Sequence, residues 1–339
     1  MRAAVIGGGV GGLTAAIGLR KSGWEVTVYE RSAALPTTGT GLGIWRNAIE
    51  ALDELGLADA ARRAGRKQPD GSLRKPDGKV IGALRADVHL LTRPALLNLL
   101  ADALPADTIR FGAAVTWQDC DEDLIVAADG INSATRRALF GVDVRQSGAI
   151  GWRGTVDLEV EAGGETWGKG VKFGLTPQAD GRTNWYAMTG PDADLQSVFE
   201  GWHDPIPQVL AQSKDVLRHS LDYLPALRSY YQGRTVLLGD AAHAMTPDLG
   251  QGACQAIIDA VTLAKFLKTH NVQEGLHNYD KTRRRTTQRM TKQSLTLNRL
   301  ARLRHFTGIR DTALKAALAL APKPRESWSA DLEPDELAG

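Results

Sequence analysis

A glycine-rich loop near the N-terminus constrains the fold more than any other feature of this sequence. The apolar run 3–6 precedes five glycines between Gly7 and Gly12, arranged as GxGxxG, and an apolar helical pattern follows over 13–22. The next strand-like segment, 24–30, ends in Glu30, where a carboxylate can bind both hydroxyls of an adenosine ribose. This order predicts a dinucleotide-binding α/β domain, without separating FAD from NAD.

The residues of this first motif have distinct expected tasks. Glycines permit the tight turn, the close approach of backbone to a pyrophosphate, and the packing of the helix on the sheet. Arg31, next to Glu30, either contacts adenine or phosphate or is a solvated surface residue. The predicted dinucleotide contacts from this region are Gly7, Gly9, Val10, Gly11, Gly12, Glu30 and Arg31.

A second strand-loop-helix segment lies far along the chain. The apolar run 235–238 ends in Gly239-Asp240, and after a turn residues 250–255 open a periodic apolar helix. The amides in the first turn of a helix have no intrahelical partner, and the helix dipole adds about half a positive charge there. Such amides suit the electron-rich pyrimidine side of a reduced flavin.

Gly239-Asp240, followed by Pro247 and Gly250-Gln251-Gly252, resembles the second flavin-binding motif of the class A (single-component) FAD-dependent aromatic monooxygenases, which have the p-hydroxybenzoate hydroxylase fold. The resemblance extends from residue 2 to about residue 300 and favours FAD for the first motif. It implies an α/β protein with a Rossmann-like FAD-binding domain, an interleaved antiparallel-sheet substrate domain and C-terminal helices.

Further segments resemble cofactor-binding segments of the same family. The glycine cluster 39–43 is similar to the segment beside the flavin ring, and Arg93, between the helix cap Thr92 and Pro94, takes the place of an arginine that reaches the pyrophosphate and ribityl region. A strand ending in Asp129-Gly130 is similar to a motif that serves FAD and NAD(P)H. The resemblance therefore adds these cofactor contacts: Gly43, Arg93, Asp129, Asp240, Pro247, Gly250, Gln251, Gly252 and Ala253.

Turn-rich segments and the resemblance together predict an interleaved domain organisation. The FAD-binding domain is expected at 1–68, 92–148 and 226–275, the substrate-binding sheet at 69–91 and 149–225, and a C-terminal helical region at 276–339. About 25 residues separate Leu104 from Asp129, so a hairpin usual in the family is expected to be trimmed.

The strand-rich region 151–188 is expected to form one wall of a substrate pocket. Arg153 and Lys172 are candidate cations for an acidic or phenolic substrate, and Asp248 is expected to face them. In the urate-hydroxylating branch of the family an Arg and a Tyr take the places of Lys172 and Asn184, so urate is not favoured. The predicted catalytic residues are Asp248, Pro247 and Lys172, and the predicted pocket residues are Arg153, Asn184 and Trp185, although the aromatic residues could instead be core.

The resemblance implies an enzyme. In this family NAD(P)H reduces the flavin, O2 adds to its C4a carbon as a hydroperoxide, and one oxygen atom passes to a small aromatic or conjugated substrate. Two alternatives stay open: a flavin oxidoreductase or epoxidase of the same fold acting on an isoprenoid or polyene, and a non-catalytic FAD-binding protein. NADH and NADPH are not distinguished.

The composition gives no indication of a nucleic-acid partner, a membrane span or a metal site. The net charge of +2 is too small to indicate nucleic acid, and no apolar run approaches the ~20 residues that span a membrane. Cys120 and Cys254 lack metal or redox spacing, which favours a reducing, cytoplasmic location and no metal site. A monomer or homodimer is expected. His243 is expected to make a loop hydrogen bond. Residues 281–315 hold eleven Lys and Arg and one Asp; a solvated helix face is favoured over contact with an anionic membrane.

Overall fold

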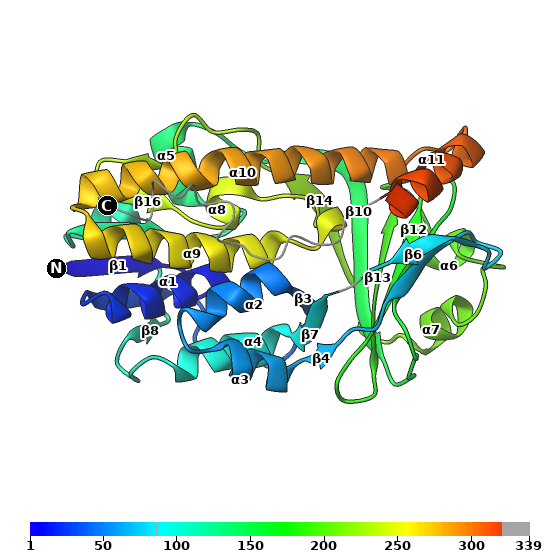
Figure 1. Cartoon of the computed structure of the whole chain (residues 1–339), viewed down its shortest axis with the longest axis horizontal. Helices are drawn as coiled ribbons and strands as arrows, with labels where there is room; N and C mark the ends of the chain where they lie inside the picture. Colours follow the sequence, from blue (N-terminus) through cyan, green and yellow to red (C-terminus); the bar gives the residue numbers. More distant parts are fainter. Residues whose placement is uncertain (86, 321–339) are drawn as a thin grey trace.

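The computed structural model of the chain describes residues 1–85 and 87–320, so residues 321–339 of the predicted C-terminal region lie outside the described residues. Figure 1 shows an elongated molecule with a parallel sheet near the N-terminus and an antiparallel sheet at the opposite end. Helix α10 (Val272–Ala301) runs along both of them. The predicted fold class, α/β with an interleaved antiparallel sheet and C-terminal helices, is confirmed.

Short apolar runs form a six-stranded sheet that is parallel except for its edge strand β15. The central strands are buried on both faces, as continuous apolar runs in parallel sheets usually are. The strand order is β15 (Tyr231–Gln232), β16 (Thr235–Leu237), β9 (Leu124–Ala127), β1 (Arg2–Ile6), β2 (Glu25–Glu30) and β8 (Ile109–Phe111).

Helices α1 (Val10–Lys21) and α9 (Gly252–Thr269) pack against each other on this sheet. Their close approach depends on Gly18, because a Cβ there would lie 2.8 Å from the Cβ of Ala264. The carboxyl ends of β1, β9 and β16 meet at one edge, where ligands usually bind such sheets.

The other helices are α2 (Arg46–Asp53), α3 (Ala58–Ala64), α4 (Arg93–Asp102), α5 (Ala134–Phe140), α6 (Leu195–Val198), α7 (Ile206–Gln212), α8 (Asp240–His243), α11 (Thr307–Leu320) and the short η1 (Trp117–Asp119) and η2 (Pro247–Leu249).

The second sheet has seven strands and is antiparallel except where β11 meets β5. Its order is β14 (Leu217–Tyr223), β10 (Arg145–Val156), β13 (Thr183–Thr189), β12 (Lys172–Pro177), β11 (Gly164–Trp167), β5 (Gly71–Arg74) and β6 (Val80–Leu84). A small third sheet joins β3 (Gly41–Trp45), β7 (Val88–Thr92) and β4 (Arg66–Lys67). The domain boundary predicted at residue 91 therefore falls inside β7.

Strand register divides the side chains of the antiparallel sheet between two faces, since directly opposite residues share a face. One face, here called the inner face, carries Arg153, Glu165, Lys172, Asn184, Tyr186 and Met188. The opposite face packs against α6 and α7 through an apolar cluster that includes Phe173, Trp185 and Phe199. The inner face is thus polar, and the opposite face is core.

Trp185 was predicted to line the pocket, and the structure contradicts this. Its side chain is fully buried on the face opposite Lys172, and its ring stacks on Phe173 with centroids 5.4 Å apart. The alternation of side chains along a strand places its neighbours Asn184 and Tyr186 on the inner face instead.

We expect Trp185→Ala to lower the free energy of unfolding by about 3–5 kcal/mol, because it leaves a cavity in this cluster. Urea unfolding measures the change. Phe111→Ala is the control, since 40% of that side chain is exposed and its loss should cost far less. Equal effects of the two substitutions would contradict the assignment of Trp185 to the core.

Candidate cofactor and substrate site

The first glycine loop presents free backbone amides at the edge of the parallel sheet. Helix α1 begins at Val10, earlier than the predicted residue 13, and its cap Gly9 contributes no side-chain hydrogen bond. A Cβ at Gly12 would lie 1.9 Å from the carbonyl oxygen of Gly7, so this packing requires glycine. The amides of the first turn, which have no intrahelical partner, are available for the predicted pyrophosphate contact.

Glu30 stands beside this loop at the end of β2. Its Oε2 accepts a 2.7 Å hydrogen bond from the Gly8 amide, and its Oε1 accepts one of 2.8 Å from the Ser32 amide. Burial alone would raise the pKa of Glu30, but these hydrogen bonds and the charge of Arg31 outweigh it, so the pKa is lowered. Each oxygen keeps a second lone pair, which a ribose hydroxyl can use.

Two carboxylates with unused acceptor atoms follow β9 and β16. Asp129 accepts a hydrogen bond from the Thr135 amide through Oδ2, while its buried Oδ1 has no donor among the described residues. Asp240 is exposed and accepts no hydrogen bond from residues 1–85 or 87–320. The buried guanidinium of Arg136 donates to the carbonyl oxygens of Ile131 and Ala241, which ties the two loops together. Both carboxylates can accept hydrogen bonds from cofactor hydroxyls.

The segments predicted to border the flavin ring lie together. Gly250 adopts a left-handed conformation, φ +63°, and the cap of α9, Gln251, makes no side-chain bond to the first turn. Trp45 Nε1 donates to the Gly250 carbonyl oxygen at 3.1 Å, and Cys254 Sγ donates to the Gly43 carbonyl oxygen. The strand that contains Gly43 therefore lies beside the free amides of α9.

Three predicted arginine contacts differ in their surroundings. Arg31 and Arg93 are exposed, and Arg93 begins α4 after Thr92, whose hydroxyl caps the helix as predicted. Arg153 is half-buried, and its pKa is lowered by burial first and then by Arg93 nearby. Since Asp240 is also among its electrostatic neighbours, Arg153 lies toward the cofactor end of the inner face.

The centre of the inner face is a buried ion cluster. Lys172 Nζ lies 3.1 Å from Asp248 Oδ1 and 3.1 Å from Glu165 Oε1. Burial would lower the pKa of Lys172, but the two carboxylates outweigh it and raise that pKa above its ordinary value. Lys172 and Asp248 are thus brought together as predicted, although the partner carboxylate Glu165 was not anticipated.

Asn184 also lies on the inner face, but its acceptor is occupied. The Gly41 amide donates to Asn184 Oδ1 at 2.9 Å, which fastens the antiparallel sheet to β3. Asn184 therefore links the substrate sheet to the ring-side strand, a role that the sequence did not suggest.

Known proteins and protein families match this chain in sequence. Two family models match, one described as an FAD binding domain over residues 214–294 and one as an FAD dependent oxidoreductase over residues 2–130. The aurachin C monooxygenase/isomerase of Stigmatella aurantiaca is 34% identical over 304 residues, 78% of this chain and 79% of that protein. The 3-amino-4-hydroxybenzoate 2-monooxygenase of Streptomyces cremeus is 32% identical over 84% of this chain and 83% of that protein. The chain belongs to the FAD-dependent aromatic monooxygenases.

The fold of this monooxygenase agrees with that assignment. The structure of Klebsiella pneumoniae HpxO complexed with FAD and uric acid matches it with a TM-score of 0.84 and 25% identity, over 94% of this chain and 92% of that one. The predicted FAD cofactor is therefore confirmed. Within residues 1–85 and 87–320, no helix combines the length and apolar character needed to cross a bilayer.

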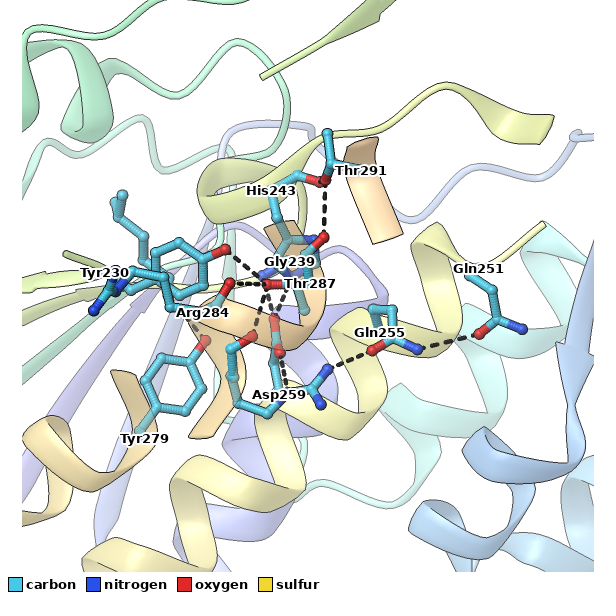
Figure 2. Close-up of polar contacts among 12 residues, drawn as sticks. Tyr230, Gly239, His243, Gln251, Gln255, Asp259, Tyr279, Arg284, Thr287 and Thr291 are labelled. Atoms are coloured by element: carbon cyan, nitrogen blue, oxygen red, sulfur yellow. Dashed lines mark hydrogen bonds and ion pairs between the residues drawn. The ribbon is translucent and has the colours of Figure 1, made fainter. Parts of the chain in front are cut away.

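Asp259 on α9 of the monooxygenase is a buried carboxylate that hydrogen-bonds to the segment of the second FAD motif (Figure 2). Its Oδ2 accepts hydrogen bonds from the Gly239 amide at 3.1 Å and from His243 Nε2 at 2.6 Å, and its Oδ1 accepts one from Arg283 Nε at 2.7 Å. His243 thus bonds to a helix, not within its loop. Burial would raise the pKa of Asp259, but His243 and Arg283 outweigh it and hold it at about 2.

The network continues from Asp259 to the ring end of the site. Arg283 donates to Gln255 Oε1, and Gln255 donates to the side chain of Gln251, the cap of α9 (Figure 2). Asn47 on α2 donates to the same Gln251 oxygen. Sequence reasoning missed Asp259 and Arg283; the available signal for Asp259 was a charged residue among apolar neighbours, whereas Arg283 lies in a polar, basic segment that gives no such signal.

We expect Asp259→Asn to weaken FAD binding at least about tenfold and to destabilise the fold by about 3–5 kcal/mol, because Arg283 keeps a buried charge without its partner. FAD titration monitored by flavin absorbance, together with urea unfolding, measures both effects. The wild-type contribution is complete above about pH 4 and is lost as the pH falls toward 2, since the folded pKa is depressed.

The matched control is Asp280→Asn. Asp280 is also a buried carboxylate with an arginine partner, Arg284, but it accepts from the Tyr230 amide at 2.7 Å, away from the FAD motif. We expect this variant to lose stability while the folded protein keeps its affinity for FAD. An equal loss of FAD affinity in both variants would count against a specific role for Asp259.

Proposed function

We propose that this monooxygenase uses NAD(P)H and O2 to hydroxylate a small aromatic or related conjugated compound between the flavin and the inner face. The observation that supports this most directly is the ion pair between Asp248 and Lys172. Asp248 precedes the ring-side Gly250 by two residues, so the pair joins the flavin loop to the centre of the substrate sheet.

The proposed division of tasks follows from the residues present. Bound FAD would accept electrons from NAD(P)H and pass them to O2, and the chain must hold the aromatic ring close by and keep water away. Gly7, Gly9, Val10, Gly11, Gly12 and Glu30 hold the adenosine and pyrophosphate; Asp129, Asp240 and Arg93 hold the ribityl region; Gly43, Pro247 and residues 250–253 border the ring. These roles are proposals that the free amides and unused acceptor atoms support.

Asp248 is the proposed carboxylate for the substrate. Its side chain is 1% exposed and already has two partners, Lys172 and Asn298, which hold it in one orientation. A carboxylate in that position can accept a hydrogen bond from a phenolic hydroxyl or take its proton as the ring is attacked.

Two buried free thiols, Cys120 and Cys254, are consistent with the proposed cytoplasmic location.

The decisive experiment is a screen of phenols, aromatic acids and heterocycles for stimulated NAD(P)H oxidation by the FAD-loaded protein. Labelled O2 and product mass analysis then show whether one oxygen atom enters the product. A protein that oxidises NAD(P)H without any labelled product from the whole panel would contradict a hydroxylase.

We expect Asp248→Asn to keep bound FAD but to lower coupled product formation about 100-fold, because an amide accepts no proton at neutral pH. Product per NAD(P)H consumed is the measurement. Asp157→Asn, an exposed carboxylate beyond the end of β10, serves as the control and should behave like the wild type. Unchanged product formation in Asp248→Asn would refute this role.

A further inference from the structure

We infer that the preferred substrate is an uncharged aromatic compound that carries a hydrogen-bond donor, such as a phenol, an aminophenol or an NH heterocycle, and not an aromatic carboxylate. The inference rests on the proposed function. It follows from the charge balance at the inner face and from a free acceptor atom beside it.

Two carboxylates already pair with the positive charge of Lys172. Glu165 and Asp248 each place an oxygen 3.1 Å from its Nζ, so the three side chains together carry one net negative charge. The Lys172 and Asp248 side chains are 4% and 1% exposed, so solvent screens this charge weakly. A substrate carboxylate would therefore meet a negative cluster at the position where the sequence suggested a free cation.

Neighbouring rings enclose the lysine further. The rings of Trp167 and Tyr186 lie 5.7 and 5.9 Å from Lys172 Nζ, within cation–π range. Both also hold its counter-ion, because Trp167 Nε1 donates to Glu165 Oε2 and the Tyr186 hydroxyl donates to Glu165 Oε1. Glu165 thus cannot turn away to release Lys172 for a substrate anion without breaking these two hydrogen bonds.

The same region lacks donors, not acceptors. Asp248 Oδ1 has Lys172 Nζ as its partner at 3.1 Å, whereas Asn298 Oδ1 is buried without a donor among the described residues. The two side chains are joined, since Asn298 Nδ2 donates to Asp248 Oδ2 at 3.0 Å. An unpaired buried acceptor such as Asn298 Oδ1 is costly, so a ligand that brings an O–H or N–H group gains where a carboxylate does not.

The other cation of the inner face, Arg153, is directly opposite Tyr186 at the edge of the Lys172 cluster. It makes no ion pair with residues 1–85 or 87–320, and its electrostatic neighbours are Arg93, Asp240 and Tyr186, of which Arg93 and Asp240 are proposed to serve FAD. A cation so placed favours the negative end of the cofactor. It leaves the Lys172 cluster to decide which substituents the aromatic ring can carry.

Matched compounds test the inference. The FAD-loaded protein is titrated with 2-aminophenol against 3-amino-4-hydroxybenzoate, and with phenol against salicylate, and binding is followed as the perturbation of the flavin absorption spectrum. We expect the uncharged member of each pair to bind at least about tenfold more tightly. Equal or tighter binding of the acids, or no binding of either uncharged compound at millimolar concentration, overturns the inference.

Glu165→Gln tests the cause, because it removes one negative charge and keeps an acceptor for Trp167 or Tyr186. The preference for the uncharged member should fall by a factor on the order of ten, from the Coulomb energy of one charge at this range. Glu159→Gln is the control, since that carboxylate is 64% exposed and pairs with Arg66 away from the cluster. An unchanged preference in Glu165→Gln, with FAD still bound, overturns the charge argument.

Binding and turnover separate this inference from the proposed function. If the uncharged compounds bind preferentially but no labelled oxygen enters any product, the substrate class stands and the hydroxylase proposal fails. If acids are hydroxylated and bind more tightly, the hydroxylase proposal stands and the substrate class fails.

Discussion

The buried charge of Asp259 is the constraint on which the cofactor site depends. An ion removed from water costs several kcal/mol unless nearby charges and donors replace its hydration. Asp259 has three such donors, and one of them, the Gly239 amide, belongs to the loop that carries Asp240. Arg283 and His243 make the carboxylate tolerable in the core, and the same carboxylate accepts from the loop of the second FAD motif. A change at Asp259 therefore acts on that loop as well as on the core.

The substrate site depends in turn on how two sheets meet. The flavin-side segments come from the parallel sheet and α9, whereas the inner face belongs to the antiparallel sheet. Only a few contacts described above join them, among them the Asp248–Lys172 pair and the bond from Gly41 to Asn184. Helix α10 runs along both halves (Figure 1) and contributes Asn298 to the junction. The separation between the flavin-side segments and the inner face is thus set by directional polar contacts and not by apolar packing alone.

Much of the cofactor site could be predicted because its signals are local. The glycine loop, Glu30 at the end of β2 and the cap Thr92 are each defined by residues a few positions apart. The inner face could not be predicted in the same way, because a shift of one residue in a strand exchanges its faces. Trp185 was predicted to line the pocket together with its neighbour Asn184, although adjacent residues of a strand point to opposite faces. Asp259 and Arg283 were missed because their partners come from distant segments that only the fold brings together.

The ion cluster on the inner face is not accounted for by stability. Buried ion pairs can often be replaced by apolar residues of similar volume with no loss of stability, so the free energy of folding gives no reason to retain Glu165, Lys172 and Asp248. An apolar replacement would, however, remove the two carboxylates and the ammonium group from the centre of the inner face. Sites built to hydrogen-bond a substrate discriminate strongly against compounds that leave their polar groups unpaired, whereas apolar pockets discriminate weakly. Under the proposed function, substrate selection is therefore the property that this cluster would provide and that an apolar wall would not.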